Sequence, residues 1–282
     1  MPKLATLVAT ILLLTGCASL VSSATTRMAD NITLAISNQD DPATVRDGAP
    51  AYLLMIDGLI EGDPENIDLL LSGAKLYGSY ASAFVEDETR AQRLANKSYA
   101  YAKRALCEQV ADVCNSTGAR LDQFQASLTA SGTKDLKVLY GFAVAWAGWI
   151  QANSSDWNAI ADISKVKVLF QHCLELDETF DDGGSHIYLG VFESLLPPSL
   201  GGQPEIARKH FERALELSQG RNLMISVLMA KHYARLVFDQ ELHDSLLGEV
   251  LSTDPVYPGF TLINTLAKPQ AEQLLAESEA FF

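Results

Sequence analysis

The sequence predicts an all-α protein, arranged as a superhelical array of about five helical hairpins with a C-terminal capping helix. Three observations support this fold class. Apolar residues recur at helical spacing along most of the chain, no segment alternates like a strand for long, and similar helix endings recur near residues 64, 178, 219 and 255. Because one hairpin cannot bury its own apolar face, neighbouring hairpins are expected to stack.

The clearest helical signal lies in residues 204–217. Pro204 and Glu205 suit a first helical turn, and Gly220 suits a C-cap after the last turn. The apolar positions match the second helix of a tetratricopeptide (TPR) hairpin, where small residues let two helices approach closely and an aromatic side chain fills the space between hairpins. These positions are Ala207, Phe211, Ala214, Leu215 and Leu217. The array is therefore predicted to be TPR-like.

The recurring endings divide the chain into helix pairs. We expect these pairs at 27–62, 66–107, 134–178, 185–219 and 221–254, with a joining helix near 118–130 and a terminal helix from Pro269 to Phe282. The alternative is a generic helical bundle without true repeats.

The N-terminus has the features of an export signal. Lys3 precedes an apolar run over 4–14 that is too short to span a membrane, which takes about 20 apolar residues. The run ends in Leu14-Thr15-Gly16-Cys17, which looks like a bacterial lipobox, where the signal is cut before the cysteine and the thiol receives a diacylglyceryl group. The alternative is an ordinary signal peptide with an incidental cysteine.

The lipobox divides the chain into a signal peptide over 1–16, a lipidated tether over 17–26 and one helical domain over 27–282. Ala18 and Ser19 follow the cysteine, and the absence of an Asp there favours the outer membrane, with the protein facing the periplasm. Several acyl chains would anchor the protein firmly.

Charge and residue spacing exclude several functions. Loss of Lys3 with the signal leaves 20 basic against 35 acidic residues, a net charge of about −15, which disfavours nucleic-acid binding. The histidines lack the paired spacing of a metal site, and the sequence predicts no cofactor. Cys107 and Cys114 lie seven positions apart across a predicted helix end, so they form either a disulfide or two buried thiols.

Two aromatic stripes are candidates for binding a ligand or a partner. Each stripe shares one helix face on a predicted first helix, which would line the concave side of the array. The alternative is that the rings are core between hairpins. One stripe is Tyr77, Tyr80 and Phe84, and the other is Phe142, Trp146 and Trp149.

His186 is a further candidate, because it follows a short acidic loop and could bind a carboxylate or a metal; the alternative is an ordinary histidine in a surface turn. The pair Glu193-Ser194 resembles the acid of lytic transglycosylases. Such enzymes need an adjoining lysozyme-like domain, for which the chain has no spare segment, so we expect no enzyme.

Around the clearest helix the sequence resembles the TatT family, the TPR-containing lipoproteins associated with TRAP transporters. Ser185 and Ile187 depart from the proline and arginine that often flank this histidine in the family, so no role of that arginine carries over. The resemblance covers most of the mature chain. The matching stretches around this helix are Gly183-Gly184-Ser185-His186, Leu189-Gly190, Leu196-Pro197-Pro198, Leu200-Gly201-Gly202-Gln203-Pro204, 207–215 and Arg221-Asn222, and the others are Phe84-Val85-Glu86, Trp146-Ala147-Gly148-Trp149-Ile150 and Glu249-Val250-Leu251.

The resemblance implies a lipoprotein component of a TRAP-type uptake system that works beside a periplasmic solute-binding subunit. Members of the family can form trimers and are proposed to hold or pass small organic ligands, hydrophobic ones included. The alternative function is a TPR scaffold lipoprotein for outer-membrane or pilus assembly.

Overall fold

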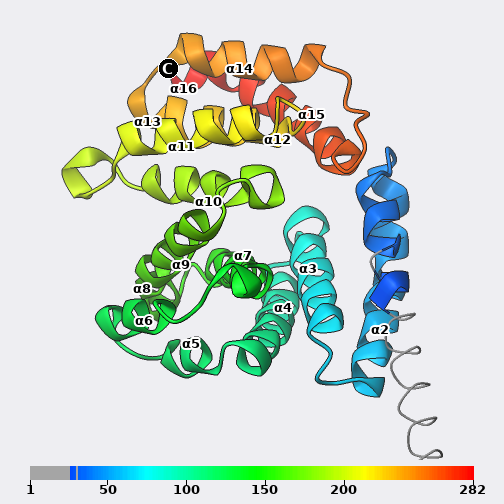
Figure 1. The fold of residues 1–282 in the computed structure, drawn as a ribbon. Helices are drawn as coiled ribbons and strands as arrows, with labels where there is room; N and C mark the ends of the chain where they lie inside the picture. Colours follow the sequence, from blue (N-terminus) through cyan, green and yellow to red (C-terminus); the bar gives the residue numbers. More distant parts are fainter. Residues whose placement is uncertain (1–25, 30) are drawn as a thin grey trace, which may run out of the picture.

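The computed structural model describes residues 26–29 and 31–282, and these residues contain no β-strand (Figure 1). The predicted all-α class is therefore confirmed. Predictions for the signal peptide and for lipid attachment at Cys17 concern residues outside the described ranges.

The helices follow one another in antiparallel pairs that stack along the chain (Figure 1). An N-terminal helical segment (residues 26–29 and 31–37) precedes them. The helices are α2 (Pro42–Gly62), α3 (Ile67–Phe84), α4 (Glu88–Gln109), α5 (Ala111–Ser116), α6 (Leu121–Leu128), α7 (Leu136–Ala152), α8 (Trp157–Ala161), α9 (Ile163–Leu176), α10 (Gly184–Glu193), α11 (Pro204–Leu217), α12 (Met224–Leu228), α13 (Arg235–Val237), α14 (Gln240–Ser252), α15 (Thr261–Ala276) and α16 (Ser278–Phe281). A π-helical turn, Met229–Ala234, joins α12 to α13.

Four helix pairs lie where the recurring endings place them. They are α3 with α4, α7 with α9, α10 with α11, and the α12–α13 segment with α14. In the third pair the ring of Phe211 lies against Gly190, where a Cβ atom would come within 3.0 Å of the ring. The glycine thus lets α10 and α11 approach closely, as the TPR-like pattern requires. The number of true repeats stays a prediction.

One predicted boundary is wrong. The terminal helix begins at Thr261, eight residues before Pro269, which lies inside α15. Proline in a first turn is only a local preference, and burial of Ala267, Ala271 and Leu274 against the preceding pair keeps the helix continuous. The predicted joining helix near 118–130 is present as α6, and a further short helix, α5, precedes it.

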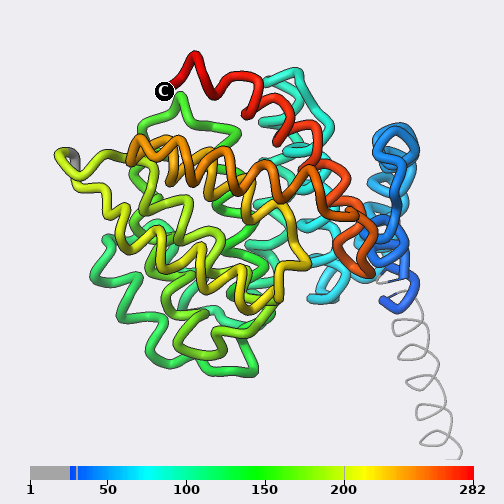
Figure 2. The backbone as a smooth tube through the Cα atoms, turned by 90° about the horizontal axis from the view of Figure 1, so that it is seen from above, coloured from blue at the N-terminus to red at the C-terminus, as the bar shows by residue number. Residues whose placement is uncertain are grey.

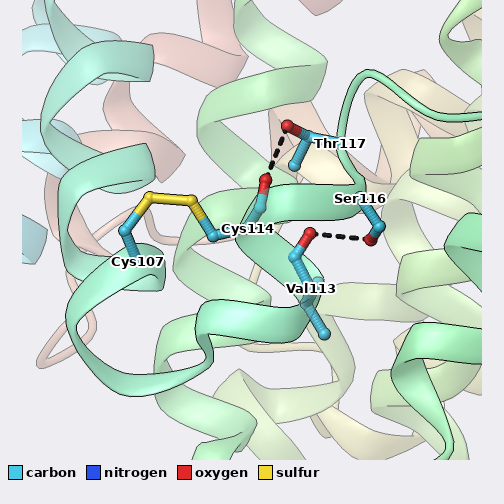
Figure 3. Close-up of a disulfide and its surroundings, with 5 residues drawn as sticks. All are labelled: Cys107, Val113, Cys114, Ser116 and Thr117. Carbon is cyan, nitrogen blue, oxygen red and sulfur yellow. Dashed lines mark hydrogen bonds between the residues drawn. A yellow bond between two sulfur atoms is a disulfide. The ribbon is translucent and has the colours of Figure 1, made fainter.

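The break between α4 and α5 is bridged by a disulfide between Cys107 and Cys114, whose Cα atoms are 5.0 Å apart (Figure 3). Thr117 donates a hydrogen bond of 2.9 Å to the carbonyl of Cys114, and Ser116 donates one of 2.8 Å to that of Val113. The short α5 is thus held by one covalent bond and by two hydrogen bonds at its end.

A proline inside α2 explains how that helix is joined to α3. Pro50 has no N–H, so the carbonyl of Arg46, four residues earlier, loses its helical donor. The hydroxyl of Tyr80 donates to this carbonyl at 3.2 Å. The candidate residue Tyr80 therefore replaces a missing backbone hydrogen bond, and this contact joins α3 to α2.

We expect Tyr80→Phe to lower the free energy of unfolding by about 1 kcal/mol, because the Arg46 carbonyl then loses its donor. In a Pro50→Ala background the restored N–H can bond that carbonyl, so the same substitution should cost almost nothing. Urea unfolding of the four proteins measures the coupling directly. Equal costs in both backgrounds would show that the proline and the tyrosine act independently.

Removal of the disulfide in Cys107→Ala/Cys114→Ala should lower the free energy of unfolding by about 2 kcal/mol, since the unfolded chain gains the freedom of a short loop. Chemical denaturation with and without dithiothreitol measures this change. The reductant should destabilise the native protein to a similar extent and leave the double variant unchanged. A native protein insensitive to the reductant would contradict the prediction.

Candidate functional site

The tryptophan stripe on α7 packs inside the array. Trp146 is fully buried, with the rings of Phe142 and Phe124 at 5.1 and 5.8 Å. Trp149 is half-buried, and its Nε1 donates a 2.7 Å hydrogen bond to Asn96 of α4. Both rings therefore join α7 to its neighbours, and neither lines the cavity described below.

Tyr77 belongs to a polar cluster that joins α2, α3 and α4. The carboxylate of Asp57 accepts hydrogen bonds from Tyr77 at 2.8 Å and Tyr101 at 2.7 Å, and it pairs with the ammonium of Lys97. Partial burial opposes ionisation of this carboxyl, but the hydrogen bonds from Lys97 and both tyrosines outweigh it and lower the pKa of Asp57. The hydroxyl of Tyr77 is thus committed to helix packing.

His186 also lies inside the fold, with 8% of its surface exposed. Its Nδ1 is 2.8 Å from Nδ1 of His210 on α11, and its Nε2 is 3.6 Å from the carboxylate of Glu178. A single proton can occupy the space between the two Nδ1 atoms. If His210 donates it, Nε2–H of His186 faces Glu178, which is the favourable tautomer. Among the described residues no group of three potential ligands could hold a metal.

The buried side chain of Glu193 has a structural role, because it forms an ion pair between two helices. Its buried carboxylate lies 2.7 Å from the ammonium of Lys167, and the neighbouring Ser194 hydroxyl donates to the backbone of Gly190. This glutamate and serine therefore connect α10 to α9 and cap the end of α10.

A cavity of about 330 Å³ lies where the two ends of the array meet. The N-terminal helical segment, α2, α3 and α15 form its walls, and Tyr188 reaches it from α10. Tyr80 and Phe84 of the first aromatic stripe are part of the wall. The apolar lining residues are Ile36, Val45, Ala49, Leu53, Leu76, Tyr80, Ala83, Phe84, Tyr188, Leu262, Ile263 and Leu266; the others are Thr33, Ser37, Lys75, Ser79, Ser82 and Gly259.

The cavity depends on a contact between segments far apart in the sequence. The backbone N–H of Gly259, just before α15, donates a 2.6 Å hydrogen bond to the side chain of Asn38, which follows the N-terminal helical segment. Gly259 has a φ of +85°, a conformation that favours glycine. Figures 1 and 2 both show α15 beside the N-terminal helices. This contact closes the cavity on the side of α15.

The chemistry of this cavity suits binding. Its volume lies at the lower end of the range of small-molecule pockets, which is about 300–1,000 Å³, and most of its lining is apolar. Among the described residues, none of those that line it is a carboxylate, a histidine or a cysteine. No helix among the described residues combines the length and hydropathy needed to cross a membrane.

Two histidines make the stability depend on pH. Burial lowers the pKa of His210 and of His232 from 6.5 to about 4, with nearby positive charge as a smaller cause. The unfolded chain therefore binds more protons between these values, so the free energy of unfolding should be greatest above about pH 6.5 and fall as the pH drops towards 4. Urea unfolding at pH 7 and pH 5 measures the change. The double variant His210→Gln/His232→Gln should lose less unfolding free energy between pH 7 and pH 5 than the native protein does. An equal loss in both proteins would contradict the prediction.

A comparison with protein families tests the suspected resemblance. The family model of the TRAP transporter T-component matches residues 38–282, from the asparagine that bonds Gly259 to the last residue. No individually curated protein matches the chain. The matched region holds α2, α3 and α15 and most of the cavity wall. The chain belongs to the TRAP transporter T-component family, TatT.

Proposed function

We propose that this TRAP transporter component holds a small apolar organic ligand in the cavity between the N-terminal helical segment, α2, α3 and α15, and docks a periplasmic solute-binding subunit. The cavity supports the first part, because it is largely apolar and of suitable size. Membership of a transporter family supports the second, since uptake systems of this type work with a solute-binding subunit.

The proposal includes a location in the cell envelope, which membership of a transporter family supports. A lipid on Cys17 would hold the helical array at the membrane through a short tether, with the array facing the periplasm, and several acyl chains would make the attachment firm. The outer-membrane inner leaflet and a homotrimer are part of this proposal, and they rest on the lipobox pattern and on the resemblance to the family.

The cavity also separates the proposal from its alternative. A TPR scaffold for outer-membrane or pilus assembly would bind partners on its outer surfaces and would have no need of an apolar pocket of small-molecule size. The cavity is partly open to solvent, so its apolar lining is in contact with water when no ligand is bound. An apolar ligand would remove that lining from water, and the apolar character of the lining is the observation that favours the ligand-holding function.

Ligand binding can be tested with the neutral fluorescent probe N-phenylnaphthylamine. We expect saturable binding to the native protein and at least roughly tenfold weaker binding to Ala83→Trp, because the indole would occupy the cavity. Ala126→Trp, on the exposed face of α6, is the matched control and should bind as the native protein does. Equal binding by both variants would place the probe elsewhere and reject the cavity as the binding site.

Docking is tested by size-exclusion chromatography with the solute-binding protein of the same transporter. We expect the two proteins to elute together, and separate elution would reject the docking part of the proposal.

A further inference from the structure

The N-terminal helical segment is apolar on both of its faces. On its inner face Ala29 is buried in the main core, and Thr33 and Ile36 line the cavity. On its outer face Met28 and Leu34 have 46% and 55% of their surface exposed. A helix that meets water on one side normally has polar residues there, whereas a helix that is apolar all round is covered. The outer face is therefore expected to have a partner.

The outer face also lacks acidic residues among those described. It consists of Arg27, Met28, Asn31, Ile32, Leu34 and Ala35, five of which line a shallow groove along the segment. Arg27 is the one charged side chain among the described residues of the segment. By contrast, the exposed face of α11 carries Lys209, Glu212 and Glu216. The outer face thus differs from the exposed faces of the array in both charge and polarity.

This charge distribution favours a lipid surface as the partner. From Cys17 to Asn38 the sequence has one basic residue, Arg27, and one acidic residue, Asp30, whereas 20% of the whole chain is charged, with an excess of acidic residues. Anionic lipid headgroups repel an acidic protein surface. The outer face carries a positive charge instead, and an arginine can reach a headgroup phosphate while its stem lies along apolar neighbours.

The place of the segment in the chain points to the same partner. Thr26 lies nine positions after Cys17, and nine residues reach at most about 32 Å when fully extended. With a lipid on Cys17, the segment is the described part of the chain that stays nearest to the bilayer. Figures 1 and 2 show it at the edge of the array, beside α2 and α15, and its outer face is exposed.

A second copy of the chain suits the outer face less well. The segment runs over 26–37, which is about 18 Å of helix, and a helix about 10 Å wide then offers on the order of 200 Å². A stable protein interface takes about 800 Å² from each partner. A bilayer sets no such lower limit, because a short apolar face there adds to the attachment that an acyl chain already provides.

We infer that the N-terminal helical segment lies on the bilayer surface through its outer face. Met28 and Leu34 then enter the boundary between headgroups and acyl chains, and Arg27 binds a headgroup phosphate. This inference rests on the proposed lipid attachment at Cys17 and adds a second contact with the membrane. The two contacts together hold α2 and α15 beside the bilayer and fix the orientation of the array.

The test uses the lipidated full chain in vesicles of phosphatidylethanolamine and phosphatidylglycerol. Pyrene maleimide is attached at Ala35→Cys on the outer face or at Lys209→Cys on α11, which is also exposed. Cys107 and Cys114 are bonded and Cys173 is buried, so the introduced thiol is the one that reacts. Nitroxide-labelled lipid should quench pyrene at position 35 by roughly twofold or more, because an interfacial helix places its apolar face among the lipids. Pyrene at position 209 should keep its emission.

Two double variants test whether the apolar side chains make the contact. Met28→Gln/Leu34→Gln should reduce the quenching at position 35 towards that at position 209, because both apolar side chains of the contact are lost. Leu196→Gln/Ile206→Gln is the matched control, since Leu196 and Ile206 are 48% and 40% exposed and lie far from the segment in the fold. It should leave the quenching unchanged. Circular dichroism of each variant confirms that the fold is retained.

The other outcomes separate this inference from the lipid attachment. Protein that floats with the vesicles but shows equal quenching at positions 35 and 209, or none at position 35, would overturn the inference and leave the attachment intact. Excimer emission from pyrene at position 35 would show that a second copy covers the outer face, which also overturns it. Protein that does not float with the vesicles would reject both the attachment and the inference.

Discussion

An amphipathic helix can bury only the apolar stripe on one of its faces, and it needs a neighbour to do so. In this protein the requirement passes from pair to pair: α4 packs on α3 and α7, α9 packs on α7 and α10, and α11 packs on α10. The buried side chains form one large cluster from α2 to α10 and two smaller ones around α11 to α15. Each helix pair inside the array therefore has a neighbouring pair on both sides, whereas the pair at each end has one on a single side.

The functional interest of the fold lies where these two ends meet. The N-terminal helical segment and α2 have α3 on one side, and α15 approaches them from the other end of the chain. Their surfaces do not interdigitate completely, and a space of about 330 Å³ is left between them.

Polar side chains hold the junctions between helices in register. Asp57 receives hydrogen bonds from two helices, Tyr80 replaces the donor that Pro50 lacks, and Asn264 of α15 bonds the backbone of Leu223 at 2.8 Å. Each contact satisfies a group that would be costly to leave unpaired in a partly buried position. These contacts also explain why several residues that suggest a binding site from their chemistry are part of the framework.

The sequence by itself determined the helical class, the positions of four helix pairs and the family, because apolar periodicity and the glycine-containing linker before Pro204 are local patterns. Only the tertiary structure decided which aromatic rings reach the cavity. Helical spacing places Tyr80 and Trp146 on comparable faces, yet Tyr80 lines the cavity and Trp146 is fully buried. The difference arises because α7 packs against α3, α4 and α9, whereas one side of α3 faces the cavity beside α15. The contact between Asn38 and Gly259 joins residues 221 positions apart, and no local pattern encodes such a closure.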